Sequence, residues 1–298
     1  MRMNQPTTGF LGAEVQMDLS RLDSEIAVLG VPCGWPYPRP GTTAGCAEAP
    51  VAVRRRSQRL ARYVDHWDFD RDAPMTLRPM VDAGDVPGEA TDGAGNSTRI
   101  AQAVGELVDR GVIPICIGGD DSVTIPVLRG VAARGPLTVL QVDAHLDFRD
   151  EVDGIREGYS SPMRRASEMA HVDRIIQVGL RGVGSARPAD VDDARAAGNL
   201  LVTAREVHER GVGWVLEHVP ADASVFLAFD CDGLDPSVFP AVSAQAPGGL
   251  SYLQAFELLS GIRSRLVGAV FTELVPALDL NDVSALVLTR LMSAATAK

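Results

Sequence analysis

Residues 137–147 read Leu-Thr-Val-Leu-Gln-Val-Asp-Ala-His-Leu-Asp, so an apolar run leads directly into two carboxylates and an imidazole. An apolar run with β-branched residues is typical of a strand that is buried on both faces of a parallel sheet. If the extended backbone continues, the side chains of Asp143, His145 and Asp147 share one side and converge at the carboxyl end of that strand. Burying three such groups together costs free energy unless a cation lies among them. The spacing therefore predicts a divalent metal site.

Acidic residues also follow two other apolar runs, 112–118 and 224–229. These acidic residues are Asp120, Asp121, Asp230 and Asp232. A single Asp after a strand often only caps a helix or starts a turn. The carboxyl ends of parallel strands meet at one edge of a sheet, however, and clustered anions repel one another unless a cation neutralises them. Three acidic strand ends therefore favour a metal site more strongly than one.

The acidic clusters lie within an alternation of short strands and helices. Runs rich in Val, Ile and Leu predict strands at residues 25–31, 80–83, 112–118, 137–143, 174–179, 199–203, 224–230 and 266–273. Helical spacing lies between and after them, at residues 97–110, 122–134, 189–197, 204–219, 251–265 and 281–294. This alternation predicts an α/β protein in which helices cover both sides of a parallel sheet. No linker or repeat divides the chain, so we expect residues 1–298 to form one domain.

The composition is that of an ordinary soluble globular protein, with 46% hydrophobic and 22% charged residues. A net charge of −11 disfavours nucleic acid and anionic membranes as partners. The cysteines form no Cys-x-x-Cys pair, and neither a secretion signal nor a membrane-spanning stretch is visible. We therefore expect a cytoplasmic protein with reduced cysteines. The run Arg54-Arg55-Arg56 is interpreted as a solvated helix face.

Motifs spread over nearly the whole chain resemble those of the ureohydrolase family, which contains arginases, agmatinases and guanidino-acid hydrolases. They include Leu-Gly-Val-Pro at 29–32, Arg-Pro-Gly at 39–41, Asp-Ala-Gly-Asp at 82–85 and Glu-Leu-Val-Pro-Ala-Leu-Asp at 273–279. The most specific matches are Asp-Ala-His-Leu-Asp at 143–147 and Asp-Cys-Asp-Gly-Leu-Asp-Pro at 230–236. The resemblance implies a three-layer α/β/α fold around a parallel eight-stranded sheet, and two manganese ions that activate a bridging water.

The resemblance also implies a role for individual residues. One metal would be held by Asp143, His145, Asp230 and Asp232. The second would share Asp143 and Asp230 and add Asp121 and Asp147. Glu273 would receive the guanidinium of the substrate, because a carboxylate binds that planar cation through charge-assisted hydrogen bonds. Members of the family tend to form trimers or hexamers, so we expect a homo-oligomer.

Two positions depart from the family's motifs. The family's Gly-Gly-Asp-His-Ser is here Gly-Gly-Asp-Asp-Ser at 118–122, so Asp121 replaces an imidazole ligand. Its oxygen suits Mn²⁺ or Mg²⁺, but its charge makes the bridging hydroxide harder to form. The family's Ser-His-Gly-Thr-Pro-Met is here Gly-Tyr-Ser-Ser-Pro-Met at 158–163, so Tyr159 replaces a proton-shuttling His. A phenol titrates near ~10 and is a poor base near neutrality.

These observations predict a metal-dependent hydrolase that cleaves a C–N bond of a guanidino or amidino compound and releases urea from a simple guanidine. Arginases carry an acid after Gly-Leu-Arg, whereas residues 182–185 read Gly-Val-Gly-Ser, so free arginine is not the expected substrate. We expect Glu273, Tyr159 and Asp147 to be catalytic.

The sequence also allows purely structural roles for three of these residues. Asp121 could be a helix N-cap, Glu273 a buried structural partner and Tyr159 a packing residue. A chain with Asp121 and Tyr159 at those positions could be a catalytically degenerate family member that only binds or regulates. A further alternative keeps hydrolysis but uses a single metal ion.

Overall fold

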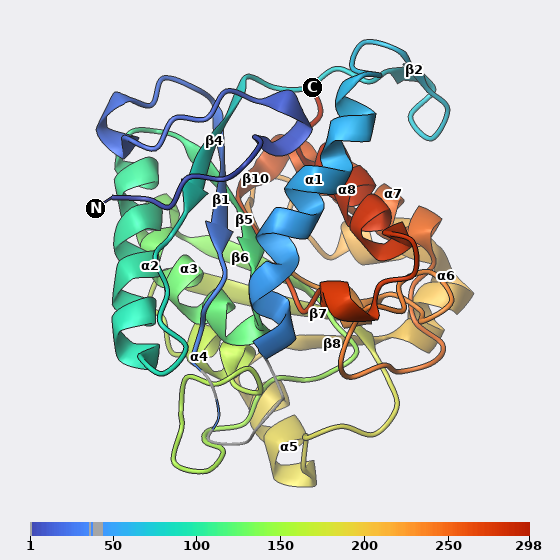
Figure 1. Ribbon diagram of the computed structural model, residues 1–298. Helices are drawn as coiled ribbons and strands as arrows, with labels where there is room; N and C mark the ends of the chain where they lie inside the picture. The colour runs from blue at the N-terminus through green and yellow to red at the C-terminus, as the bar shows by residue number, and fades with distance from the viewer. Residues whose placement is uncertain (1, 36, 38–43) are drawn as a thin grey trace.

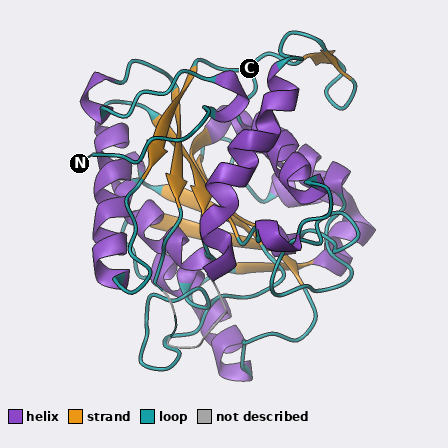
Figure 2. Ribbon diagram, viewed as in Figure 1, coloured by secondary structure: helices purple, strands orange, loops and turns teal. Residues whose placement is uncertain are grey.

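The computed structural model describes residues 2–35, 37 and 44–298, and its centre is an eight-stranded sheet (Figures 1 and 2). The strands lie in the order β4–β1–β5–β10–β9–β6–β7–β8, and every neighbouring pair is parallel. Their bounds are Ile26–Val31 (β1), Met80–Asp85 (β4), Ile113–Gly118 (β5), Leu137–Val142 (β6), Val172–Leu180 (β7), Leu200–Thr203 (β8), Ser224–Asp230 (β9) and Leu266–Thr272 (β10). Each overlaps a strand that the sequence predicts, so the parallel sheet is confirmed.

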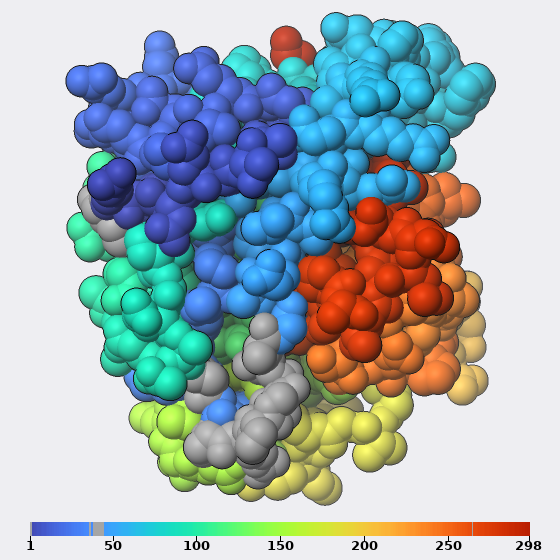
Figure 3. All heavy atoms as spheres, viewed as in Figure 1, coloured from blue at the N-terminus to red at the C-terminus, as the bar shows by residue number. Residues whose placement is uncertain are grey.

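Two layers of helices bury the two faces of the sheet. Along each strand successive side chains enter opposite cores, as Ile26 and Ala27 do on β1. One core is completed by α1 (Ala49–Ala61), α6 (Ala204–Glu217), α7 (Tyr252–Ile262) and α8 (Val283–Ala295). The other is completed by α2 (Gly93–Asp109), α3 (Thr124–Gly130), α4 (Pro162–Ser167) and α5 (Pro188–Ala196). Figure 3 shows α1 packed between the N-terminal residues and α8. The three-layer α/β/α fold is therefore confirmed.

The structure adds elements that spacing alone does not predict. These are the helix α4 and a short antiparallel pair, β2 (Trp67–Asp68) with β3 (Ala73–Pro74), whereas α1 is the helix expected around the arginine run at 54–56. The helix predicted over residues 122–134 is α3 flanked by two 3₁₀ turns, Asp121–Val123 and Ala132–Arg134. The Arg-Pro-Gly motif at 39–41 lies outside the described residues.

The interpretation of the arginine run as a solvated face was wrong for one of its members. Arg54 is only 1% exposed, and its Nε donates to Asp82 Oδ2 at 2.8 Å, while its Nη1 pairs with Asp85. Arg55 is exposed, as expected. Adjacent helical residues point about 100° apart, so only one of the three arginines can pair with the buried Asp82 and the partly buried Asp85 of β4.

Four neighbouring strands in the middle of the sheet, β5, β10, β9 and β6, carry predicted site residues at their carboxyl ends. Asp121 follows β5, Glu273 follows β10, Asp232 follows β9 and Asp143 follows β6. The strands β5 and β6 are consecutive in the chain but are separated in the sheet by β10 and β9. Open α/β sheets bind ligands at such a switch point. Every helix that the structure describes is too short or too polar to cross a bilayer.

Candidate metal centre

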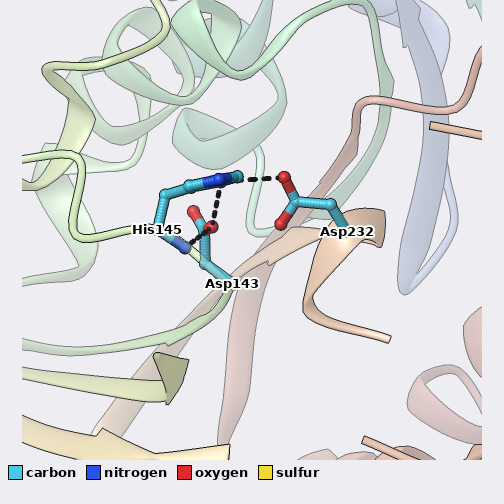
Figure 4. Close-up of side chains that lie close together, drawn as sticks. All are labelled: Asp143, His145 and Asp232. Atoms are coloured by element: carbon cyan, nitrogen blue, oxygen red, sulfur yellow. Dashed lines mark hydrogen bonds and ion pairs between the residues drawn. The ribbon is translucent and has the colours of Figure 1, made fainter. Parts of the chain in front are cut away.

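The end of β6 and the 3₁₀ turn after β9 bring three predicted ligands together (Figure 4). His145 Nδ1 lies 2.9 Å from Asp232 Oδ2 and 3.5 Å from Asp143 Oδ1. The backbone N–H of His145 donates to Asp143 Oδ1 at 2.5 Å, which fixes the turn between them. Both aspartates are buried. Two carboxylates therefore face one imidazole nitrogen, and this geometry suits a shared proton or a shared cation.

A second group of carboxylates adjoins the first and shares Asp143 with it. Asp121, Asp143 and Asp230 are all buried, and each offers one oxygen that lies within 4.8 Å of the other two. The same limit holds for the ligand atoms of Asp143, His145 and Asp232. Asp147 belongs to neither compact group, although the charge of Asp143, after burial, raises the pKa of Asp147. The structure thus offers two adjacent cation positions that meet at Asp143.

Asp121 is held in one orientation by two threonines. Its Oδ1 accepts hydrogen bonds from Thr124 Oγ1 at 2.8 Å and from Thr272 Oγ1 at 2.7 Å. Its Oδ2 is buried and has no hydrogen-bond partner among the described residues. The capping role belongs to Asp120 instead, whose side chain accepts from the backbone N–H of Ser122 at 3.0 Å. A buried carboxylate oxygen without a donor is costly, so Asp121 Oδ2 fits a metal ion.

All the predicted site residues except the fully buried Asp143 line one cavity of about 530 Å³. Its wall includes Asp121, His145, Asp147, Tyr159, Asp230, Asp232 and Glu273. Tyr159 packs edge-on against Tyr37, with ring centroids 4.4 Å apart. None of the other histidines lines this cavity. A ligand in it would therefore meet the carboxylates, the imidazole and the phenol together.

Glu273 has an unusual backbone conformation, with φ at 66°, directly after β10. A non-glycine residue pays about 1–3 kcal/mol for such a conformation, which persists where surrounding contacts enforce it. Here the Glu273 N–H donates to Gly119 O at 3.0 Å, and Glu273 Oε2 lies 3.5 Å from the Cys46 thiol. The carboxylate is thereby placed in the cavity beside Asp121.

Comparisons with known proteins agree with this geometry. The model of the Arginase family matches residues 24–297. A guanidinopropionase of Pseudomonas aeruginosa is 34% identical over 272 residues, which cover 88% of this chain and 83% of the relative. The chain belongs to the arginase family. A mitochondrial agmatinase of Gallus gallus is 30% identical over 280 residues, which cover 91% of this chain and 79% of that protein.

A solved structure supports the same assignment of this arginase-family protein. The proclavaminate amidino hydrolase of Streptomyces clavuligerus superposes with a TM-score of 0.84 and 26% identity, over 99% of this chain and 97% of that one. The agreement extends over the whole sheet, so the site residues lie in the fold that the family shares.

Burial and mutual repulsion raise the pKa values of five acidic groups in the site of this arginase-family protein. Burial, together with the charge of Asp143, raises the pKa of Asp121 to about 8. Burial, together with the charge of Asp232, raises the pKa of Asp143 to about 6. Burial likewise raises the pKa values of Asp147, Asp230 and Glu273 well above their usual range. A divalent cation bound by the candidate ligands among them would favour the ionised forms of those ligands over the protonated forms.

The same crowding keeps the imidazole of His145 charged. Burial lowers the pKa of His145, but the hydrogen bonds and charges of Asp143 and Asp232 outweigh it and raise that pKa to about 11. A proton on His145 Nδ1 and a metal cation would therefore compete for the space between the two carboxylates.

Sequence reasoning missed several residues that shape the centre. Arg181 donates from Nη2 to the carbonyl oxygens of Asp232 at 2.6 Å and of Ala246 at 2.7 Å, which ties two walls of the cavity together. Gly184 lies so close to the His145 ring that a Cβ would meet Cδ2 at 2.6 Å. Neither contact has a local sequence signal. Gln141, which lies two residues before Asp143 in an apolar strand, did have one in the period-two spacing.

Proposed function

We propose that this arginase-family protein is a manganese-dependent amidinohydrolase that cleaves a C–N bond of a guanidino or amidino compound. The proposal depends above all on one observation, that two adjacent groups of candidate metal ligands share a cavity with Glu273. The names of the relatives, guanidinopropionase and agmatinase, support this substrate class. The activity is proposed to resemble that of an agmatinase or a guanidino-acid hydrolase.

The donor set is proposed to hold two Mn²⁺ ions. One position would use Asp143, His145, Asp230 and Asp232, and the other Asp121, Asp143, Asp147 and Asp230. Carboxylate oxygens with a single imidazole suit a hard divalent ion of this kind. When bound, such ions supply an activated water and stabilise developing negative charge.

The residues of the chain orient the substrate and manage its protons. Glu273 binds the planar guanidinium, so that the carbon to be attacked faces the metal ligands. Asp147 accepts a proton from the attacking water and passes it to the leaving amine, and Tyr159 donates a hydrogen bond from the cavity wall. Water adds to the carbon, the bond to the substrate's tail breaks, and urea and a protonated amine are the products of a simple guanidine.

The test is urea release from a panel of guanidino compounds, with Mn²⁺ added and with metal stripped by a chelator. We expect manganese-dependent release that Asp230→Ala abolishes, together with loss of bound metal. Asp222→Ala, at an exposed turn before β9, is the matched control and should leave both unchanged. If Asp230→Ala keeps full turnover, the proposal is wrong. Bound metal without urea release from any compound would favour the binding or regulatory alternative.

The panel should include guanidino acids and agmatine side by side. A second hollow of about 460 Å³ shares Tyr159, Ser160 and Ser185 with the main cavity. Its wall carries charges of both signs, from Arg149, Glu151, Asp153 and Arg187. Both anionic and cationic tails therefore have candidate partners beyond the metal ligands.

Other expectations from the sequence stay predictions. These are one domain over residues 1–298, a cytoplasmic location, a trimeric or hexameric assembly and the absence of a nucleic-acid partner.

A further inference from the structure

A row of buried side-chain amides crosses three neighbouring strands and ends on Asp143. Gln141 lies on β6, Gln177 is its register partner on β7, and Asn199 directly precedes β8. Gln141 is 1% exposed, Gln177 is fully buried and Asn199 is 9% exposed. The row therefore runs from the edge of the sheet to the metal centre inside the molecule.

The hydrogen bonds along this row have one direction. Gln177 Nε2 lies 2.7 Å from the carbonyl oxygen of Leu146, which can only accept, so this nitrogen is the donor. The same nitrogen donates to Gln141 Oε1 at 2.6 Å, which leaves Gln141 Nε2 to donate to Asp143 Oδ2 at 2.6 Å. Asn199 Nδ2 donates to Gln177 Oε1 at 2.9 Å. Each amide is thus oriented by the one before it.

These amides occupy positions that an apolar side chain could fill. Val139 and Ile175, two residues before Gln141 and Gln177 on the same strands, pack in the apolar core of that face. A buried amide is tolerated only when its hydrogen bonds are made, and a network that is satisfied throughout specifies one geometry. The geometry specified here is that of the loop from Asp143 to Leu146.

We propose that Gln141 and Gln177 are positioning residues of the metal centre. Gln141 holds Oδ2 of Asp143, while the backbone N–H of His145 holds Oδ1, so the shared ligand of both candidate groups has a fixed orientation. Gln177 stabilises the same loop with a second hydrogen bond, which it donates to the carbonyl oxygen of Leu146, between His145 and Asp147. A site that is already oriented loses less free energy when an ion binds. The inference rests on the proposed function, because it requires that Asp143 binds metal.

The experiment measures Mn²⁺ binding to the metal-free full-length chain by calorimetry, for Gln141→Met, Gln177→Met and the double variant. Each single change should raise the Kd for Mn²⁺ by about 10- to 100-fold, the usual effect of losing a partner of a metal ligand. The Kd of the double variant should be little higher than that of the weaker-binding single variant, because both changes break the same row of hydrogen bonds. Val139→Ala is the matched control, since it removes packing from the same strand and core without a polar contact. It should lower the melting temperature and keep the Kd within about twofold.

Three results would overturn the inference. Wild-type Kd values in both glutamine variants would show that the row does not position Asp143. An equal loss of affinity in Val139→Ala would assign the effect to general destabilisation. A wild-type chain that neither binds Mn²⁺ nor releases urea would reject the proposed function as well. If the wild-type chain releases urea and the glutamine variants keep its Kd for Mn²⁺, only the positioning role is rejected. If Gln141→Met fails to fold, Asn199→Ala at the edge of the sheet takes its place, with an expected loss of several fold.

Discussion

Glu273 and Asp121 are joined directly, since Oε1 of Glu273 accepts a hydrogen bond of 2.8 Å from the backbone N–H of Asp121. The side chain of the proposed receptor for the guanidinium is therefore anchored to the backbone of a proposed metal ligand, although the two residues follow different strands. Thr272, immediately before Glu273, strengthens the connection by donating to Asp121 Oδ1. A substrate bound to Glu273 would thereby lie next to the proposed metal positions.

The first prediction concerns the charge of Glu273. Glu273→Gln keeps the shape of the side chain but removes the charge-assisted bonds to a guanidinium, so kcat/KM should fall roughly 10- to 100-fold. Bound manganese, measured by elemental analysis, should stay at the wild-type level. Glu257→Gln on the exposed side of α7 is the control and should behave as wild type. Unchanged kcat/KM in Glu273→Gln would remove this residue from substrate binding.

The second prediction concerns the number of metal ions. Asp121→Ala removes the unpartnered Oδ2, so we expect the metal content to fall from two ions per chain to one. Asp279→Asn is the control, because Asp279 caps α8 through the N–H groups of Ser284 and Ala285, both at 2.9 Å. It should cost about 1 kcal/mol of stability and leave the metal content unchanged. Two ions in Asp121→Ala would return Asp121 to a structural role.

The third prediction concerns pH and stability. In the metal-free protein the pKa values of Asp143, about 6, and Asp121, about 8, exceed the unfolded value. The folded state therefore binds more protons than the unfolded state above pH ~4, so its stability falls as pH rises toward 8. The raised pKa of His145 acts in the same direction above pH ~6.5.

Mn²⁺ should reverse this trend, because it replaces the bound protons and binds more tightly as pH rises. Thermal melts near pH ~6 and pH ~8 test this, with and without Mn²⁺. The melting temperature of the metal-free chain should decrease from the lower to the higher pH. The increase in melting temperature that Mn²⁺ causes should be larger at the higher pH. Asp121→Asn should weaken the pH dependence of the melting temperature in the metal-free chain. A metal-free chain that becomes more stable over this interval would contradict the assigned pKa shifts.

The fourth prediction uses the close approach of Gly184 to His145. In Gly184→Ala the new methyl group would lie 2.6 Å from Cδ2 of the His145 ring, a contact that one of the two residues must relieve, and we expect the ring to leave its position beside Asp232. Mn²⁺ affinity should fall about 10-fold or more, as expected when a ligand is displaced. Gly213→Ala in α6 is the control, since nothing lies within 4 Å of its Cβ position. Equal Mn²⁺ affinity in the two variants would show that the loop at Gly184 yields without disturbing His145.

Much of this protein could be predicted from sequence because the deciding signals are local. Parallel strands buried on both faces read as short apolar runs, and all eight strands of the sheet were found that way. Open α/β sheets bind ligands at the carboxyl ends of their strands, and this rule identifies the acidic residues after those runs as candidate site residues. The sequence therefore indicated the candidate metal ligands, and the family resemblance divided them between two metal positions that share Asp143 and Asp230.

The tertiary structure decided the questions that depend on residues far apart in the chain. Whether Asp121 caps a helix or faces the site turned on Thr272, which is 151 positions away and fixes one oxygen while the other stays unpartnered. Arg54 is buried because two carboxylates of β4 meet it. The spacing of β6 places Gln141 on a buried face, but its hydrogen-bond partner Gln177 lies on the next strand and is brought beside it only by the fold. Periodicity records only which side of an element a residue faces, whereas a buried polar group is defined by the partner that satisfies it, and only the folded chain brings the partners together.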